Sequence, residues 1–115
     1  MKIRIKSNSL RYRLTKSDVA RLTDIGYLED KIDFGDQSLL YALQLTSGDE
    51  LSATLVNNTI TLFMPEHMLL EWENTGKVGF EATRGDLNLL VEKDFTCLEK
   101  VNEDQSDNYP NPLAN

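Results

Sequence analysis

Residues 51–65 (LSATLVNNTITLFMP), near the centre of the chain, place apolar residues at every second position on each side of two asparagines. Asn57 and Asn58 suit a two-residue hairpin turn, because asparagine tolerates the positive φ that such turns require. With Val56 opposite Thr59, one face of the pair is entirely apolar and the other is mostly polar. A shift of one residue would mix the two faces, so burial of the apolar face fixes this pairing. The sequence therefore predicts a β-hairpin here.

The same alternation predicts strands on both sides of this hairpin. At the N-terminus, residues 2–6 and 10–14 alternate around the turn cluster 7–9, which indicates a second hairpin. One face of that hairpin is apolar and the other is cationic. Further segments with strand-like patterns lie at residues 27–34, 39–45, 78–82 and 87–91.

Two short helices are predicted between the strands. Thr15 suits the N-cap of a helix over residues 16–25, because its hydroxyl can accept a hydrogen bond from the backbone of Asp18. Gly26 is the residue expected just beyond the end of that helix. A second helix is expected to begin with Pro65 at its first position, where the missing N–H costs nothing, and to end at Gly76.

Short turns between successive strands predict an α+β fold. We expect a mostly antiparallel meander of about seven or eight strands with two short helices, shaped as a bent sheet or a partly closed β-barrel. We find no internal repeat in the sequence. A chain of 115 residues allows one such domain, which we place in residues 1–101. Residues 102–115 (NEDQSDNYPNPLAN) are predicted to form an acidic polar C-terminal tail with little to bury.

Charge is distributed unevenly along the chain, whose net charge is −7. Residues 1–21 hold seven cations and one acid, a net charge of +6, whereas residues 22–115 hold five cations and 18 acids, a net charge of −13. An acidic protein repels nucleic acid overall, and Tyr12 is the one aromatic residue among the first cations. Nucleic acid is therefore the least favoured partner.

The cations of the N-terminal hairpin are expected to form a ladder on its polar face, made of Lys2, Arg4, Lys6, Arg11 and Arg13. Like charges that face each other across strands destabilise a sheet, so this ladder needs an anion. The acidic remainder of the same molecule or of a second subunit would supply one, and the charges would then serve only the protein itself. Otherwise Arg4, Arg11 and Arg13 are candidates for binding a protein partner or a small anion.

The C-terminal tail offers anions of the required kind. Glu103, Asp104 and Asp107 form an acidic cluster, but they lack the glycine and the ligand spacing of an EF-hand calcium loop. Together with Tyr109 they are candidates for docking onto Arg4, Arg11 and Arg13 of the same or a neighbouring subunit. A solvated tail is the alternative.

Residues suited to catalysis or metal binding are sparse. His67 and Glu71 share a helix face, but the chain has no second histidine, so we expect no metal. Cys97 shares the parity of nearby apolar residues and has acids around it, which favours a core thiol over a nucleophile. No phosphate-binding glycine loop, serine elbow or cysteine-pair metal motif occurs. The sequence predicts no catalytic residue and no cofactor, and it favours a protein that is not an enzyme.

Nothing in the sequence directs the chain into a membrane. No apolar run approaches the roughly 20 residues that a membrane helix needs. The N-terminus lacks the continuous apolar core of a signal peptide, and a single cysteine allows no intrachain disulfide. We expect a cytoplasmic location and no membrane partner.

Several segments resemble an uncharacterised bacterial family of small proteins, a domain of unknown function. They are MKIRIKSNSLRYRLTKSDV, NNTITLFMP, EWENTGKVGF, LLVEKDFTCL and EDQSDNYPNP. The resemblance covers nearly the whole chain, and it brings no activity, ligand or catalytic residue with it. It implies that the acidic tail is a feature of the family, which favours docking of residues 103–112 over free solvation.

Two functions remain in view. The first is a non-catalytic cytoplasmic interaction module, with a basic β-face and an acidic tail that contact a protein partner or a second copy of the chain. The alternative is a small anion- or nucleotide-binding domain that uses the basic N-terminal hairpin. The oligomeric state and the place of the tail separate them.

Overall fold

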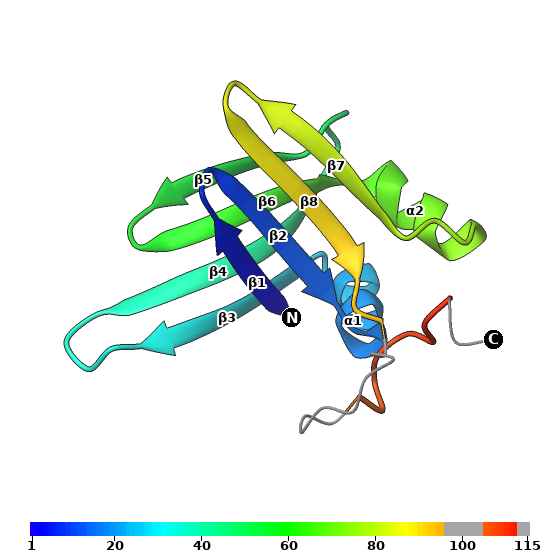
Figure 1. The fold of residues 1–115 in the computed structure, drawn as a ribbon, viewed down its shortest axis with the longest axis horizontal. Coiled ribbons are helices and arrows are strands. Elements are labelled where there is room, and N and C mark those ends of the chain that lie inside the picture. Colours follow the sequence, from blue (N-terminus) through cyan, green and yellow to red (C-terminus); the bar gives the residue numbers. More distant parts are fainter. Residues whose placement is uncertain (96–104, 113–115) are drawn as a thin grey trace.

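The structure is a computed structural model, and it describes residues 1–95 and 105–112. Within these residues the fold is α+β, with strands in two four-stranded sheets and two helices (Figure 1). The elements, in chain order, are β1 (Lys2–Lys6), β2 (Ser9–Leu14), α1 (Lys16–Ile25), β3 (Tyr27–Asp33), β4 (Ser38–Thr46), β5 (Ser52–Val56), β6 (Thr59–Pro65), α2 (Glu66–Asn74), β7 (Gly79–Arg84) and β8 (Leu87–Lys93).

The order of strands differs from a simple meander. The first sheet has the order β1-β2-β8-β7, and the second has the order β3-β4-β6-β5. Each sheet consists of two antiparallel hairpins joined by a central parallel pair, β2 with β8 and β4 with β6. The two expected hairpins are confirmed, and the other four predicted strands form two more. The sheets, however, are mixed and do not close into a barrel. The reason is that α1 and α2 each carry the chain from one sheet to the other, so the strands that flank a helix do not pair.

The predicted register of the central hairpin is confirmed. Val56 lies opposite Thr59, and both turn residues, Asn57 and Asn58, have positive φ. The N-terminal hairpin has a tighter turn than expected, because Lys6 pairs with Ser9 and leaves a turn of two residues instead of three.

The first helix begins and ends as predicted. The Thr15 hydroxyl accepts a hydrogen bond from the backbone N–H of Asp18, and the Asp18 carboxylate accepts one from the backbone N–H of Thr15. Gly26 follows with a φ of 82° and donates its N–H to the carbonyl of Leu22. The second helix differs at both ends. Pro65 is still the last residue of β6 and occupies the N-cap position, and the helix stops at Asn74, before Gly76.

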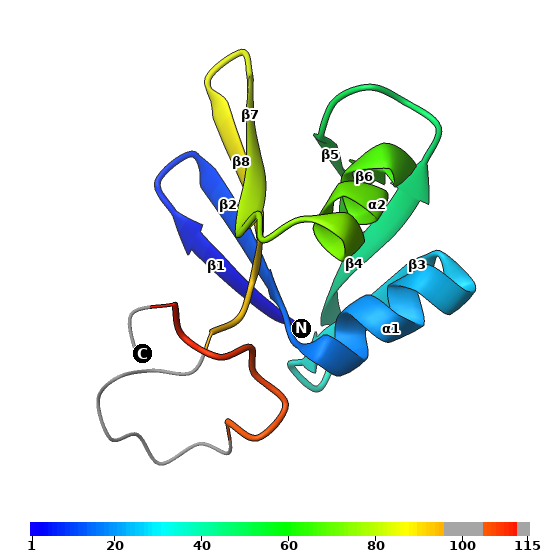
Figure 2. The same cartoon turned by 90° about the vertical axis from the view of Figure 1, so that its right-hand side faces the viewer.

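The core lies between the two sheets, and the helices lie at one end of them (Figure 2). Tyr12 is fully buried there, and its hydroxyl donates a hydrogen bond to the carbonyl of Ile60 in the second sheet, at 3.2 Å. Trp72 of α2 packs against Phe80 of β7 with ring centroids 5.5 Å apart. Both helices lie at the same end of the space between the sheets (Figure 1).

The order hairpin, helix, hairpin occurs twice, although we expected no internal repeat. The elements β5, β6 and α2 begin at Ser52, Thr59 and Glu66, and each lies 50 residues beyond the start of β1, β2 and α1. Each half contributes one hairpin to each sheet. The two halves share a pattern of apolar positions with almost no identical residues. The corresponding core pairs are Tyr12 and Leu62, Leu14 and Met64, and Leu22 and Trp72.

Candidate functional site

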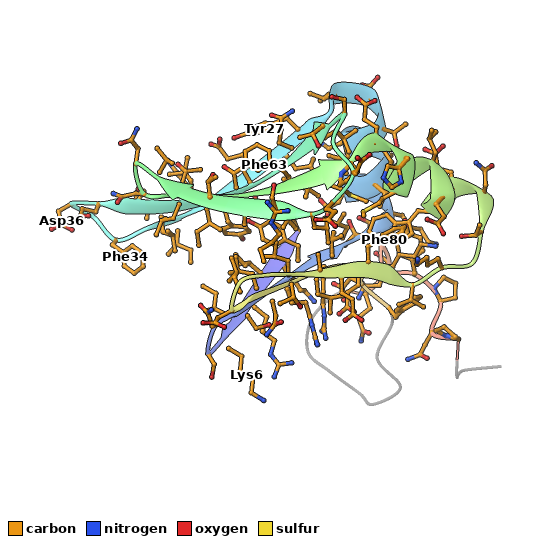
Figure 3. The ribbon with its side chains drawn as sticks, turned by 90° about the horizontal axis from the view of Figure 1, so that it is seen from above. Lys6, Tyr27, Phe34, Asp36, Phe63 and Phe80 are labelled. Carbon is orange, nitrogen blue, oxygen red and sulfur yellow. The ribbon has the colours of Figure 1, made fainter. Side chains whose placement is uncertain are left out.

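The N-terminal hairpin carries its cations on one face of the first sheet. In the β1–β2 register, Arg4 lies opposite Arg11 and Lys2 lies opposite Arg13. The residues between them on β2 are buried in the core, so the cations project away from the second sheet. Figure 3 shows Lys6 pointing to that outer side. We call this surface the basic face, and it consists of Lys2, Arg4, Lys6, Arg11 and Arg13.

Acids of the same chain neutralise part of the basic face. The parallel pairing of β2 with β8 places Glu92 beside Arg13, whose Nε donates a hydrogen bond to Glu92 Oε1 at 2.9 Å. The Nε of Arg11 lies 3.6 Å from the same oxygen. The Nζ of Lys2 lies 3.1 Å from Oδ2 of the buried Asp94, which is within ion-pair distance. The geometry at this oxygen does not meet the requirements of a hydrogen bond. Three of the five cations therefore have an anion from their own molecule.

Arg4 and Lys6 differ from the other three cations. Both side chains are exposed, and within the described part of the chain neither forms an ion pair or a side-chain hydrogen bond. Arg4 also faces Arg11 across the strands. The first strand therefore presents two charges that the described protein does not satisfy.

A hollow of about 520 Å³ lies on the same face, beside Arg11, between β2, β8 and β7. Thr83 and Asn88 line it, but they form a hydrogen bond with each other, at 3.1 Å. Glu81 adds a negative charge to the lining. Phosphate sites need several donors that converge on one point. This hollow has one cation and one carboxylate, so it is poorly suited to a phosphate.

The described part of the tail docks on the beginning of α1. The Asp107 carbonyl accepts a hydrogen bond from the backbone N–H of Lys16, and its carboxylate accepts one from the N–H of Ser17. Hydrogen bonds from Thr15 and Ser17 and the charge of Lys16 hold the pKa of Asp107 below its usual value. A carboxylate at this position also interacts favourably with the positive end of the helix dipole.

Tyr109 fixes the tail against the end of β8. Its backbone N–H donates to the carbonyl of Asp94, and its ring meets the ring of Phe95 edge-on, with centroids 6.2 Å apart. The Nζ of Lys93 lies 5.1 Å from the centre of the Tyr109 ring. Burial raises the pKa of the Tyr109 hydroxyl.

These contacts place two of the four tail-docking candidates, Asp107 and Tyr109. Asp107 contacts the start of α1, and Tyr109 contacts the end of β8 and the residues just after it. The other two docking candidates, Glu103 and Asp104, lie outside the described residues. The acids that do meet the ladder, Glu92 and Asp94, belong to the end of β8 and the residue after it.

A sequence model of a protein family matches residues 1–113, including the docked tail. The chain belongs to DUF7009, a family of unknown function. No curated protein and no solved structure matches it. The resemblance of the sequence to a domain of unknown function is thereby confirmed.

The remaining candidates of this DUF7009 chain are His67, Glu71 and Cys97. His67 and Glu71 line a hollow of about 530 Å³ between α2 and β7, together with Lys77 and Phe80. Among residues 1–95 and 105–112, no three histidine, cysteine or acidic side chains gather in a group that could hold a metal. No helix in these ranges is long and apolar enough to span a bilayer. Cys97 lies outside the described residues.

Proposed function

We propose that this DUF7009 chain is a non-catalytic module that binds an acidic protein partner through its basic face. The observation that carries the proposal is the state of Arg4 and Lys6. They are exposed, and within the described residues no anion meets them. An acidic partner would supply the charge that Glu92 and Asp94 supply to the other cations.

The arrangement of the cations suits an extended partner. Side chains on one face of a strand repeat about every 7 Å, and neighbouring strands lie about 4.8 Å apart. Arg4 and Lys6 on β1 and Arg11 and Arg13 on β2 therefore form a flat grid. Glu92 holds Arg13 in place and lies near Arg11, so these two side chains are partly ordered before a partner arrives.

A small anion fits this surface less well. The hollow beside Arg11 contains Glu81, and two of its polar side chains satisfy each other. Each new exposed ion pair contributes about 0.2–1 kcal/mol, so useful affinity requires several pairs at once. A protein segment with several acids can form them, whereas one phosphate group cannot span the grid.

We also propose a cytoplasmic location for this interaction, where the single Cys97 would remain a thiol. A different protein is favoured over a second copy of the chain, because two basic faces placed against each other would repel.

Fluorescence anisotropy of a labelled, glutamate-rich peptide of about ten residues tests the proposal. We expect binding to the full chain that weakens as salt is raised, because salt screens exposed charges. Arg4→Glu/Lys6→Glu should abolish binding. The control Arg21→Glu/Lys31→Glu changes the net charge equally at exposed positions on α1 and β3, and it should keep binding.

Equal loss of binding in the two double variants would contradict the proposal, because net charge alone would then explain the affinity. Displacement of the peptide by millimolar inorganic phosphate at constant ionic strength would instead favour the small-anion function.

A further inference from the structure

The first strand is an unpaired edge. β1 pairs with β2 on one side and with no strand of the described residues on the other. An edge strand presents a row of free backbone N–H and C=O groups, which is a template for another strand. On its outer face this edge bears only cations, Lys2, Arg4 and Lys6.

Beside this edge, part of the inner face of the second sheet is exposed to solvent. The β3–β4 and β5–β6 hairpins reach past β1 (Figure 1), and Phe34 points to the side on which the first sheet lies (Figure 3). Leu55 pairs with Ile60, and Ile32 pairs with Leu39, on this same inner face. We call these residues the apolar floor: Ile32, Phe34, Leu39, Leu55 and Ile60.

The edge strand and the floor adjoin each other. Ile5 of β1 and Leu10 of β2 line a hollow of about 300 Å³ together with Leu55 and Ile60 of the second sheet. Its remaining lining includes Ala53 and Leu87, so the hollow is mostly aliphatic. At the other end of β1, the ammonium group of Met1 lies 3.9 Å from Asp30 of β3. The hollow shares Leu55 and Ile60 with the apolar floor, and β1 borders it through Ile5. We call the hollow and the exposed floor beside it the groove.

Four large apolar side chains are exposed in the groove. Ile5, Phe34 and Leu55 are 59%, 66% and 70% exposed, and Ile32 is 45% exposed. At roughly 200 Å² for each large side chain, these four expose together about 500 Å². The largest apolar patch on a typical monomer has about this size, and such a patch is often functional.

We propose that β1 is the docking edge for an extended segment of the acidic partner, in which apolar and acidic residues alternate. The backbone of the segment pairs with β1. Successive side chains of a strand point to opposite faces, so one set rests on the apolar floor and the other set lies beside Arg4 and Lys6. This proposal rests on the proposed function and specifies its partner.

Another copy of this chain fits the groove less well. Pairing of two β1 strands would place cations opposite cations, which is destabilising. The acidic edge strand β3 of another copy would present Lys31 between Glu29 and Asp33 on one face. It would therefore bring a further cation to the basic face.

Three peptides test the proposal against the full chain by anisotropy. The first, SVEVEVES, alternates valine and glutamate. The second, SSESESES, keeps the charge and removes the apolar face. The third is the first peptide with alternate backbone nitrogens methylated, which blocks strand pairing. We expect the first peptide to bind at least about tenfold more tightly than the other two.

Leu55→Glu and Val56→Glu are matched variants, because the two residues are neighbours, are both exposed, and lie on opposite faces of β5. Leu55→Glu should reduce the affinity for the first peptide to that for the second, and Val56→Glu should leave it unchanged. Equal binding of all three peptides would overturn docking on β1 while leaving the basic face as a binding site. Absence of binding by all three would overturn the proposed function as well.

Light scattering at about 100 μM protein tests whether a second copy of the chain occupies the groove. A monomer supports a foreign partner. Self-association that Leu55→Glu abolishes, and Val56→Glu does not, would overturn the choice of partner by placing a second copy in the groove.

Discussion

Removal of the charge of Glu92 tests whether the basic face is self-repelling. Glu92→Gln keeps the size of the side chain and leaves Arg13 and Arg11 without their anion. Hydrogen bonds to charged groups contribute about 1.5–3 kcal/mol to the free energy of unfolding, whereas exposed ion pairs contribute about 0.2–1 kcal/mol. The Glu92 side chain is 18% exposed and those of both arginines are more than a third exposed, so screening places the expected loss at about 1–2 kcal/mol.

Such a loss corresponds to a fall in Tm of about 4–8 °C for a domain of this size. Urea and thermal unfolding followed by circular dichroism would measure it. The loss should shrink at 1 M salt, where the Debye length is about 3 Å, and be largest at 0.01 M salt, where it is about 30 Å. Glu81→Gln is the control, because Glu81 lies on the same face, and no ion pair of it is found within the described residues. Equal stability of the two variants at low salt would refute the view that the cations repel one another.

Three further perturbations test the fold. Burial raises the pKa of the Tyr12 hydroxyl, so the native state holds this proton more strongly than the unfolded chain does. The free energy of unfolding should therefore be complete below about pH 10 and fall above it. In Tyr12→Phe this alkaline loss of stability should be smaller. A Cβ on Gly79 would lie 2.6 Å from the carbonyl oxygen of Val91, so Gly79→Ala should cost about 1–3 kcal/mol in urea unfolding, while Gly76→Ala, with open space around it, should cost almost nothing. The pKa of Asp107 is lowered in the folded state. Tail docking should therefore be complete above about pH 4 and be lost as the pH falls through the pKa of the folded state. Hydrogen exchange of the Tyr109 amide should then accelerate, and unchanged exchange would contradict the docking role of Asp107.

Features that depend on neighbours in sequence were predictable. The turn at Asn57 and Asn58 follows from the φ values that asparagine tolerates, and the register follows from burial of one face. The start of α1 follows from Thr15 and Asp18, three residues apart. In these places local chemistry alone selects one conformation, and the structure agrees with it.

Features that depend on distant pairing were not predictable. The contact of Arg13 with Glu92 joins residues 79 positions apart, and it exists because β8 lies parallel to β2. The alternation within β2 indicates which of its faces is buried, but it does not indicate which strand lies beside it. The same limit explains the tail. Asp107 accepts hydrogen bonds from the N–H groups of Lys16 and Ser17 at the start of α1, an anion site that composition does not reveal.

The repeated hairpin–helix–hairpin order bears on the purpose of the basic face. β5 and β6 occupy in the second sheet the places that β1 and β2 occupy in the first. The fold is therefore compatible with uncharged residues at these places, and cations are not a requirement of the scaffold. The proposed binding role would account for cations at these places, and it predicts that replacing Arg4 and Lys6 by the uncharged residues of the second half does not disturb the fold. The corresponding positions are Lys2 and Ser52, Arg4 and Thr54, Lys6 and Val56, Arg11 and Thr61, and Arg13 and Phe63.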